Sequence, residues 1–312
     1  MLLSLAIVAG AALVARLADD SPGRAPDTAS EDPVDGIRIA AAGDIACDPA
    51  SRSFHDGQGS GLECRQAATS DLLVDQGYAA VLVLGDTQYE DGTSEAFAAS
   101  YDPTWGRVKS ITAPAVGNHE YNTPGAPGYF RYFGEAAGDP TKGYYSFDLG
   151  GWHLIALNSN CAQVGGCEAG SPQERWLRRD LAGSASKCTL AYWHHPHFSS
   201  GLHGGSTEYA PFWAALFDAD ADVVLAGHDH DYERFAPQTA EGHADRARGV
   251  REFVVGTGGK SLRKLPDVAA NSEAHDDSSL GVLELTLGRD AYAWRFRAAV
   301  GAFADTGSYA CH

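Results

Sequence analysis

The chain has 312 residues, of which 44% are hydrophobic and 21% are charged. This composition is typical of a globular protein and excludes a largely disordered one. The formal net charge of −18 at pH 7 argues against binding to nucleic acids or anionic membranes, so we expect no nucleic-acid partner. An anionic substrate would need cations at its binding site, and bound metal ions would supply them.

The N-terminal segment is almost wholly apolar from Leu2 to Ala15. This length fits the hydrophobic region of a signal peptide and is short for a membrane span. Residues 1–18 are therefore expected to be a signal peptide or, if uncleaved, an N-terminal anchor. Residues 19–36 are rich in Asp, Pro, Ser and Ala, which predicts a disordered linker. We expect residues 37–312 to fold as one domain, secreted or extracytoplasmic, with no stable membrane span unless the N-terminus is uncleaved.

The cysteine pattern favours disulfides. There are six cysteines and no CxxC pair, which argues against a zinc ribbon or a thioredoxin-like site. An even number in an exported chain predicts disulfide bonds. Cys161 and Cys167 flank a short glycine-rich loop and are placed to pair locally. The sequence leaves the pairing of the other four open, and six free thiols are the alternative.

Short apolar runs alternate with helical patterns, which predicts an α/β sandwich. In chain order, the expected strands are 37–42, 79–84, 113–116, 144–149, 152–158, 188–193, 222–226, 252–255, 280–287 and 291–296. The strands 144–149 and 152–158 are expected to form a hairpin across a Gly-Gly turn. The expected helices are 64–76, 171–181 and 208–217, and the second begins with the capping box Ser171-Pro172-Gln173-Glu174.

Five of these strands are followed by a residue type that binds metals: Asp44, Asp86, Asn118, His194 and His228. A glycine precedes four of the five. Because ligands of α/β folds gather at the carboxyl ends of strands, we expect these side chains to converge on one site. Carboxylate, imidazole and amide donors suit zinc, iron or manganese, and the absence of cysteine argues against a structural zinc site.

Two further residues extend this set. Tyr89 follows Asp86 by three positions, so one turn at the strand end would bring both oxygens to one metal. His230 follows His228 by two positions, and side chains two apart in extended backbone point the same way.

The ordered set Gly-Asp, Gly-Asp-x-x-Tyr, Gly-Asn-His-Glu, a histidine two residues before proline, and Gly-His-Asp-His-x-Tyr-Glu-Arg resembles the purple acid phosphatase branch of the calcineurin-like metallophosphoesterases. It spans residues 43–234. Ala46 stands where most other branches have a histidine, and together with Tyr89 this indicates the purple branch. The resemblance implies an α/β, four-layer sandwich of two mixed β-sheets flanked by helices, with residues 37–312 as the catalytic domain.

The resemblance also implies two metal ions. A ferric ion would be held by Asp44, Asp86, Tyr89 and His230, and a divalent ion (Zn²⁺, Fe²⁺ or Mn²⁺) by Asp86, Asn118, His194 and His228. Asp86 would bridge them. The family spacing selects His194 over the adjacent His195, which would point away or support the ligands from behind. His119 and His203 would contact the substrate, with His203 as a general acid.

The function implied by the resemblance is a secreted phosphatase that hydrolyses small phosphate monoesters by attack of a metal-bound hydroxide. One alternative is a phosphodiesterase acting on nucleotides or glycerophosphodiesters at the same site. A remote alternative is a non-catalytic binding protein, which would show broken ligand positions. The oligomeric state is not encoded in any pattern we identify.

Overall fold

A computed structural model describes residues 34–312 of the protein. The expected signal peptide or anchor, and residues 19–33 of the expected linker, lie outside this range. Gly36, expected as the last linker residue, is instead the first residue of a strand. Within residues 34–312, none of the helices has the length and apolar character needed to cross a bilayer.

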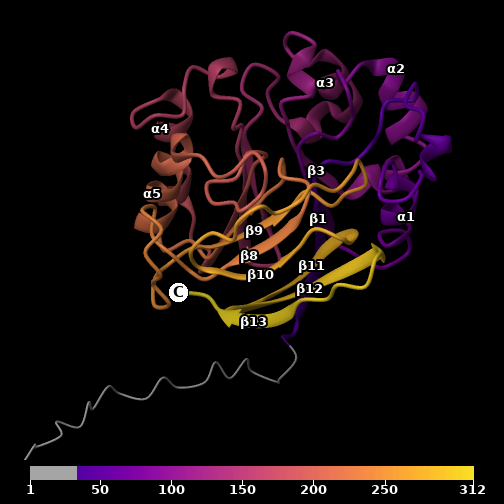
Figure 1. The fold of residues 1–312 in the computed structure, drawn as a ribbon. Coiled ribbons are helices and arrows are strands. Elements are labelled where there is room, and N and C mark those ends of the chain that lie inside the picture. The colour runs from indigo at the N-terminus through magenta and orange to yellow at the C-terminus, as the bar shows by residue number, and fades with distance from the viewer. Residues whose placement is uncertain (1–33) are drawn as a thin grey trace, which may run out of the picture.

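Two β-sheets stack to form the centre of the molecule (Figure 1). The first has the strand order β13-β12-β11-β1-β2-β3, and the second β10-β8-β9-β7-β6-β5-β4. The strands are β1 (Gly36–Ala42), β2 (Ala80–Leu84), β3 (Thr112–Ala115), β4 (Tyr145–Leu149), β5 (Trp152–Ala156), β6 (Cys188–Tyr192), β7 (Val223–Ala226), β8 (Tyr232–Phe235), β9 (Arg251–Val255), β10 (Ser272–Asp276), β11 (Leu280–Gly288), β12 (Ala291–Val300) and β13 (Thr306–Ala310).

Both sheets are mixed, as expected. In the first, β1, β2 and β3 run parallel, and β11 pairs antiparallel with β1. In the second, β5, β6, β7 and β9 run parallel. Strand β4 pairs antiparallel with β5, and β8 pairs antiparallel with β9. The parallel strands therefore carry their carboxyl ends to one edge of each sheet, where ligands of α/β folds bind.

Alternation along the strands builds two cores. On β5 and β7, Leu154 and Val223 belong to the main core between the sheets. Their chain neighbours Ile155 and Val224 face the other way, into a second core that includes Leu177 of the helix α4 (Pro172–Gly183). A sheet that is apolar on both faces needs a helical layer outside it, and α4 and the helix α5 (Ala210–Asp218) supply that layer.

The helices lie on the two outer faces. They are α1 (Gln66–Asp71), α2 (Ser94–Ala96), α3 (Pro127–Phe133), α4 (Pro172–Gly183) and α5 (Ala210–Asp218). Short 3-10 segments occur at His55–Gly57, Trp105–Ile111, Glu120–Asn122, Gly134–Ala137, Cys161–Gln163 and Thr207–Tyr209, with a π-turn at Phe97–Tyr101. In Figure 1, α1, α2 and α3 lie on the opposite side of the sandwich from α4 and α5. The four-layer arrangement implied by the resemblance is thus confirmed.

The expected helix over residues 64–76 is wrong in length, because only Gln66–Asp71 are α-helical. Cys64 has a φ of 56°, and its amide is bonded to the carbonyl of Lys260, so the helix cannot begin there. Strands β8, β10 and β13 and helices α2 and α3 are additional to the predicted elements. Ser171 caps α4 as expected, since its side chain accepts a hydrogen bond from the backbone N–H of Glu174.

All six cysteines form disulfides, so the alternative of six free thiols is wrong. Cys161 pairs with Cys167, as the spacing indicated. The pairs left open by the sequence are Cys47–Cys64 and Cys188–Cys311.

Candidate metal centre

The five strand-end residues meet at one place. Asp44, Asp86 and Asn118 follow β1, β2 and β3 of the first sheet, and His194 and His228 follow β6 and β7 of the second. The site therefore lies where the carboxyl ends of both sets of parallel strands face each other. The structure brings all seven predicted ligand residues into this cluster.

The polar atoms of the cluster form two groups. In the first, Tyr89 Oη lies 2.7 Å from Asp44 Oδ1, 3.0 Å from Asp86 Oδ2 and 3.1 Å from His230 Nε2. In the second, His194 Nε2 lies 3.0 Å from Asn118 Oδ1, 3.3 Å from Asp86 Oδ2 and 3.2 Å from His228 Nδ1. Asp86 Oδ2 is common to both groups.

The backbone turns sharply at three of these positions. Asp44, Asp86 and His228 have φ values of 60°, 46° and 70°, which lie in the left-handed region that the backbone of residues other than glycine rarely adopts. Such conformations cost on the order of 1–3 kcal/mol each and persist where the surrounding structure enforces them. Here they turn the chain at the strand ends where these side chains join the cluster.

Other bonds orient the ring nitrogens. His194 Nδ1 donates to the carbonyl of Leu84 at 2.8 Å, which directs Nε2 to the cluster. His230 Nδ1 is bonded to Ser261 Oγ at 2.9 Å, with the same effect. Metal-binding histidines are commonly held this way through the nitrogen that does not face the metal.

In Asp44 and Asp86, one oxygen of the carboxylate is held by a hydrogen bond from the backbone. Asp44 Oδ2 accepts the backbone N–H of His228 at 2.8 Å, and Asp86 Oδ1 accepts that of His119 at 2.9 Å. The remaining oxygen of each faces the cluster, so both carboxylates present a single inward oxygen.

The centre is buried and anionic. Asp44 is fully buried, and Asp86 and Tyr89 are 2% and 1% exposed. Burial, together with the charges of Asp44 and Asp86, raises the pKa of Tyr89 well above its usual range. Although burial opposes the change, Asp86 raises the pKa of His194 to about 9. Two buried carboxylates and a phenol at this spacing are best balanced by cations.

His195 does not point away from the centre. Its ring lies 4.4 Å from that of His228, and its Nδ1 is bonded to Ser159 Oγ at 2.8 Å. His194, by contrast, contacts Asn118 and Asp86 directly. His195 thus borders the ligand cluster and supports it from the side.

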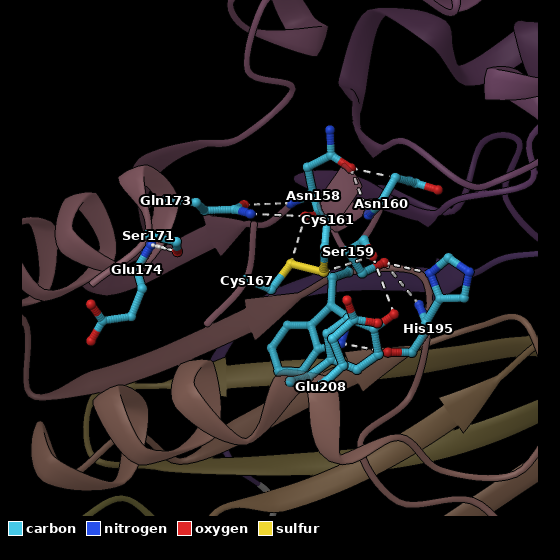
Figure 2. Close-up of a disulfide and its surroundings, with 12 residues drawn as sticks. Asn158, Ser159, Asn160, Cys161, Cys167, Ser171, Gln173, Glu174, His195 and Glu208 are labelled. Carbon is cyan, nitrogen blue, oxygen red and sulfur yellow. Dashed lines mark hydrogen bonds between the residues drawn. A yellow bond between two sulfur atoms is a disulfide. The ribbon is translucent and has the colours of Figure 1, made fainter. Parts of the chain in front are cut away.

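The loop that holds His195 is itself anchored. Figure 2 shows Ser159 and His195 next to the Cys161–Cys167 disulfide. Three residues before Cys161, the backbone N–H and C=O of Asn158 are bonded by the side chain of Gln173 of α4, at 2.7 and 2.8 Å. The position of Ser159, and through it that of His195, is fixed by both attachments.

The two predicted substrate-contacting histidines lie beside different ligand residues, His119 next to Asp86 and His203 next to His228. His119 Nδ1 donates to the carbonyl of Glu90 at 2.7 Å, and Nε2 lies 3.9 Å from Asp86 Oδ2. The ring of His203 lies 4.4 Å from that of His228. Burial and the neighbouring Arg263 lower the pKa of His203.

Four residues of the site were not anticipated from the sequence. Glu120 is fully buried and accepts backbone N–H groups of Thr87 and Gly117 at 2.7 and 2.8 Å, which joins the β2 and β3 loops. Burial raises its pKa to about 7. Asp229 holds the loop of His203 by accepting that residue's backbone N–H at 2.8 Å. The other two are Lys260 and Arg263.

Glu120 and Asp229 lie inside the Gly-Asn-His-Glu and Gly-His-Asp-His stretches. The predicted ligands next to them in the sequence could therefore have indicated that they belong to the site. Lys260 and Arg263 lie in a segment without a recognisable pattern.

Comparison with known proteins identifies the family. A profile of the "Calcineurin-like phosphoesterase" family matches residues 37–232, well over half of the chain. The chain belongs to this family. The family match also agrees with the resemblance carried by the ordered motifs of residues 43–234.

Several relatives of this calcineurin-like phosphoesterase are purple acid phosphatases. Purple acid phosphatase 15 of Arabidopsis thaliana is 26% identical over 211 residues, covering 56% of this chain and 39% of the relative. Purple acid phosphatase 21 of the same plant is 38% identical over 100 residues, covering 30% and 22%. An uncharacterised protein of Mycobacterium tuberculosis is 29% identical over 185 residues, covering 47% and 35%. The matches thus span well under half the length of these relatives.

Solved structures share the fold. Purple acid phosphatase PPD1 from yellow lupin has a TM-score of 0.72 at 18% identity, covering 89% of this chain and 54% of that one. A dimetal phosphatase from Danio rerio has a TM-score of 0.56 at 15% identity, covering 89% and 100%. GAP50, the anchor in the inner membrane complex of Plasmodium, has a TM-score of 0.62 at 13% identity, covering 88% and 89%. Because phosphatases and an anchor share the fold, the site residues must decide the function.

Proposed function

We propose that this calcineurin-like phosphoesterase is a secreted phosphatase that hydrolyses phosphate monoesters at a centre of two metal ions. The observation that carries the proposal is the shared position of Asp86 Oδ2, which lies within 3.3 Å of donor atoms in both groups. A carboxylate oxygen placed between two sets of donors is suited to bridge two cations.

The spacing of the donor atoms fits metal ions. Ligand atoms at about 2.0–2.2 Å from an ion lie roughly 3 Å from one another. The contacts within the two groups range from 2.7 to 3.3 Å. One ion would be held by Asp44, Asp86, Tyr89 and His230, and the other by Asp86, Asn118, His194 and His228.

The donor types narrow the choice of metal. Oxygen and imidazole donors without thiolate suit zinc, iron and manganese. A phenolate donor favours a ferric ion in the group of Tyr89, with Zn²⁺, Fe²⁺ or Mn²⁺ in the other. Metal ions in such sites activate water and neutralise the charge of a phosphate group.

The protein's own residues would orient the substrate. His119 has its Nδ1 proton engaged by the carbonyl of Glu90, so its Nε2 is available to a phosphate oxygen. His203 borders the second group of donors through the ring of His228. We place His203 on the side of the leaving group, where a proton donor is required.

Export from the cytoplasm is supported by two features. The three disulfides require an oxidising compartment in most organisms. The apolar run at residues 2–15 has the length of a signal-peptide core.

Two alternatives are distinguished by experiment. A phosphodiesterase would use the same donors, whereas a non-catalytic binding protein would not need all seven of them, and all seven are present. We would measure kcat/KM of the metal-loaded full chain for an aryl phosphate monoester and the matching diester. We expect the kcat/KM for the monoester, divided by that for the diester, to be well above one. A ratio below one would make the protein a phosphodiesterase, and no turnover of either would contradict the proposal.

The iron assignment has its own test. Protein loaded with iron should show a visible charge-transfer band from the Tyr89 phenolate. If no band appears, Tyr89 is not an iron ligand, and a phosphatase that uses other metals would still stand.

A further inference from the structure

A cationic segment lies along the rim of the centre. After β9, residues 258–265 carry Lys260, Arg263 and Lys264 in a chain whose net charge is −18. The backbone of this segment is attached to two of the proposed ligand residues. Lys260 N donates to the carbonyl of Asp44, and Arg263 N to that of His230, both at 2.9 Å. These backbone bonds to Asp44 and His230 therefore hold the cationic segment at the site.

Two of the three cations are neutralised by carboxylates. The ammonium group of Lys260 is paired with Glu90 and lies 4.5 Å from the ring centroid of Tyr89. Lys264 is paired with Asp277 at 2.8 Å. Their charges are thus engaged within the fold.

Arg263 differs from both. Within residues 34–312, no carboxylate pairs with its guanidinium group, which instead donates to Nε2 of His203. An imidazole compensates the charge of arginine less well than an anion does, because hydrogen bonds between two ionised partners are the stronger kind. The planar guanidinium group is also shaped to bind carboxylate or phosphate through two parallel bonds.

Space for a substrate adjoins Arg263. A hollow of about 380 Å³ lies between the loop at residues 60–63 and the segment at residues 262–264. Leu62, which is 38% exposed, and Leu262 line it together with Ser60, Glu63, Arg263, Lys264 and Asp277. Arg263 links the wall of the hollow to the centre, because its guanidinium group contacts His203, whose ring lies 4.4 Å from that of His228.

We propose that Arg263 selects phosphate esters whose leaving group carries a second anionic group close to the ester oxygen. This inference rests on the proposed function, because it places the leaving group on the side of His203. On binding, the guanidinium group would exchange its partner His203 for the second anion. The carbon skeleton of the leaving group would extend over Leu62 and Leu262.

A matched pair of substrates tests the selection. Glycerol 2-phosphate and 2-phosphoglycerate differ only in that a hydroxymethyl group of the first is a carboxylate in the second. We expect the metal-loaded full chain to prefer 2-phosphoglycerate in kcat/KM. Arg263→Gln should reduce this preference about 10- to 100-fold, mainly through KM, as expected for a lost hydrogen bond between charged groups. Arg248→Gln is the control, since this substitution removes the same charge. Arg248 is paired with Asp220 and does not line the hollow.

A binding measurement separates this inference from the proposed function. The unreactive ligands 3-phosphonopropionate and propylphosphonate differ in the same carboxylate, and calorimetry gives their Kd values without turnover. Tighter binding of 3-phosphonopropionate that Arg263→Gln removes and Arg248→Gln retains would support the role of Arg263 even in a protein without phosphatase activity. If both esters are hydrolysed but Arg263→Gln leaves the preference and the two Kd values unchanged, the inference is wrong while the phosphatase stands.

Discussion

Gly117 lies so close to Asp86 that a β-carbon on it would come within 2.1 Å of the Asp86 backbone nitrogen and 2.2 Å of Oδ1. A β-carbon on Gly85 would similarly come within 2.6 Å of Nδ1 of His194. The glycine at the end of one strand therefore makes room for a ligand supplied by another. This explains the glycines before Asp86 and Asn118, and the contact of Gly85 with His194 couples the strand ends of the two sheets.

The first prediction concerns this close contact. Gly117→Ala should displace Asp86 and lower both the metal content and the stability of the protein, the latter by roughly 1–3 kcal/mol, as overpacking of interiors does. Gly183→Ala is the control, since a β-carbon at Gly183 would meet no atom within 4 Å. Metal per chain and thermal unfolding would be measured for both. Full metal occupancy in Gly117→Ala would show that the contact is not needed.

The second prediction separates two adjacent histidines. His194→Ala should lose one metal ion per chain, because His194 Nε2 meets three other donor atoms of its group. His195→Ala should retain both ions, because it is the ring nitrogen of His194, and not that of His195, that meets Asn118 Oδ1 and Asp86 Oδ2 at 3.0 and 3.3 Å. Elemental analysis after dialysis against a weak chelator would distinguish them. Loss of metal in His195→Ala to the same extent would make His195 a ligand.

The third prediction concerns pH. Burial raises the pKa of Glu252 from 4.5 to about 8, although it accepts the N–H groups of His197 and Phe198. Between these two values the folded state binds more protons than the unfolded state, so the contribution of Glu252 to stability falls as pH rises. The slope is at most about 1.4 kcal/mol per pH unit.

Urea unfolding at pH 5 to 8 would check this. The free energy of unfolding of Glu252→Gln should decline less over this range than that of the natural protein, whereas the exposed Glu208→Gln should follow the natural curve. Parallel curves for all three would contradict the raised pKa.

The fourth prediction ranks two disulfides. Cys188 and Cys311 are 123 residues apart, and Cys161 and Cys167 are six apart. If chain entropy dominates, replacing both members by serine should cost about 4–5 kcal/mol for the first pair and about 2 kcal/mol for the second. Chemical denaturation of the two double variants would measure this. An equal or reversed order would point to strain or to structure in the unfolded state.

Much of the site could be predicted because its residues are local to strand ends. Asp44 and Asp86 each follow an apolar run and a glycine, and the carboxyl ends of parallel strands share one edge. The resemblance added that the strands form two mixed sheets in a sandwich flanked by helices. The α/β architecture followed from the same alternation of apolar runs and helical patterns.

The remainder depends on contacts between distant segments. Strands β10 and β13 have polar sequences and form only because β8 and β12 offer edges to pair with. Arg263 reaches the site because its backbone bonds that of His230, and no local pattern encodes this contact. The helix begins at residue 66 and not at residue 64 because Cys64 is held by a disulfide and by Lys260.

The most direct test of the central claim is the kcat/KM of Asp86→Asn for an aryl phosphate monoester, compared with the natural protein at the same metal load. Because Asp86 is proposed to bridge both ions, activity should fall at least about 100-fold, given that residues which merely orient ligands are worth about 10- to 100-fold. Asp91→Asn, the same change at an exposed position five residues away, should remain fully active. Unchanged turnover in Asp86→Asn would contradict the assignment of the metal centre.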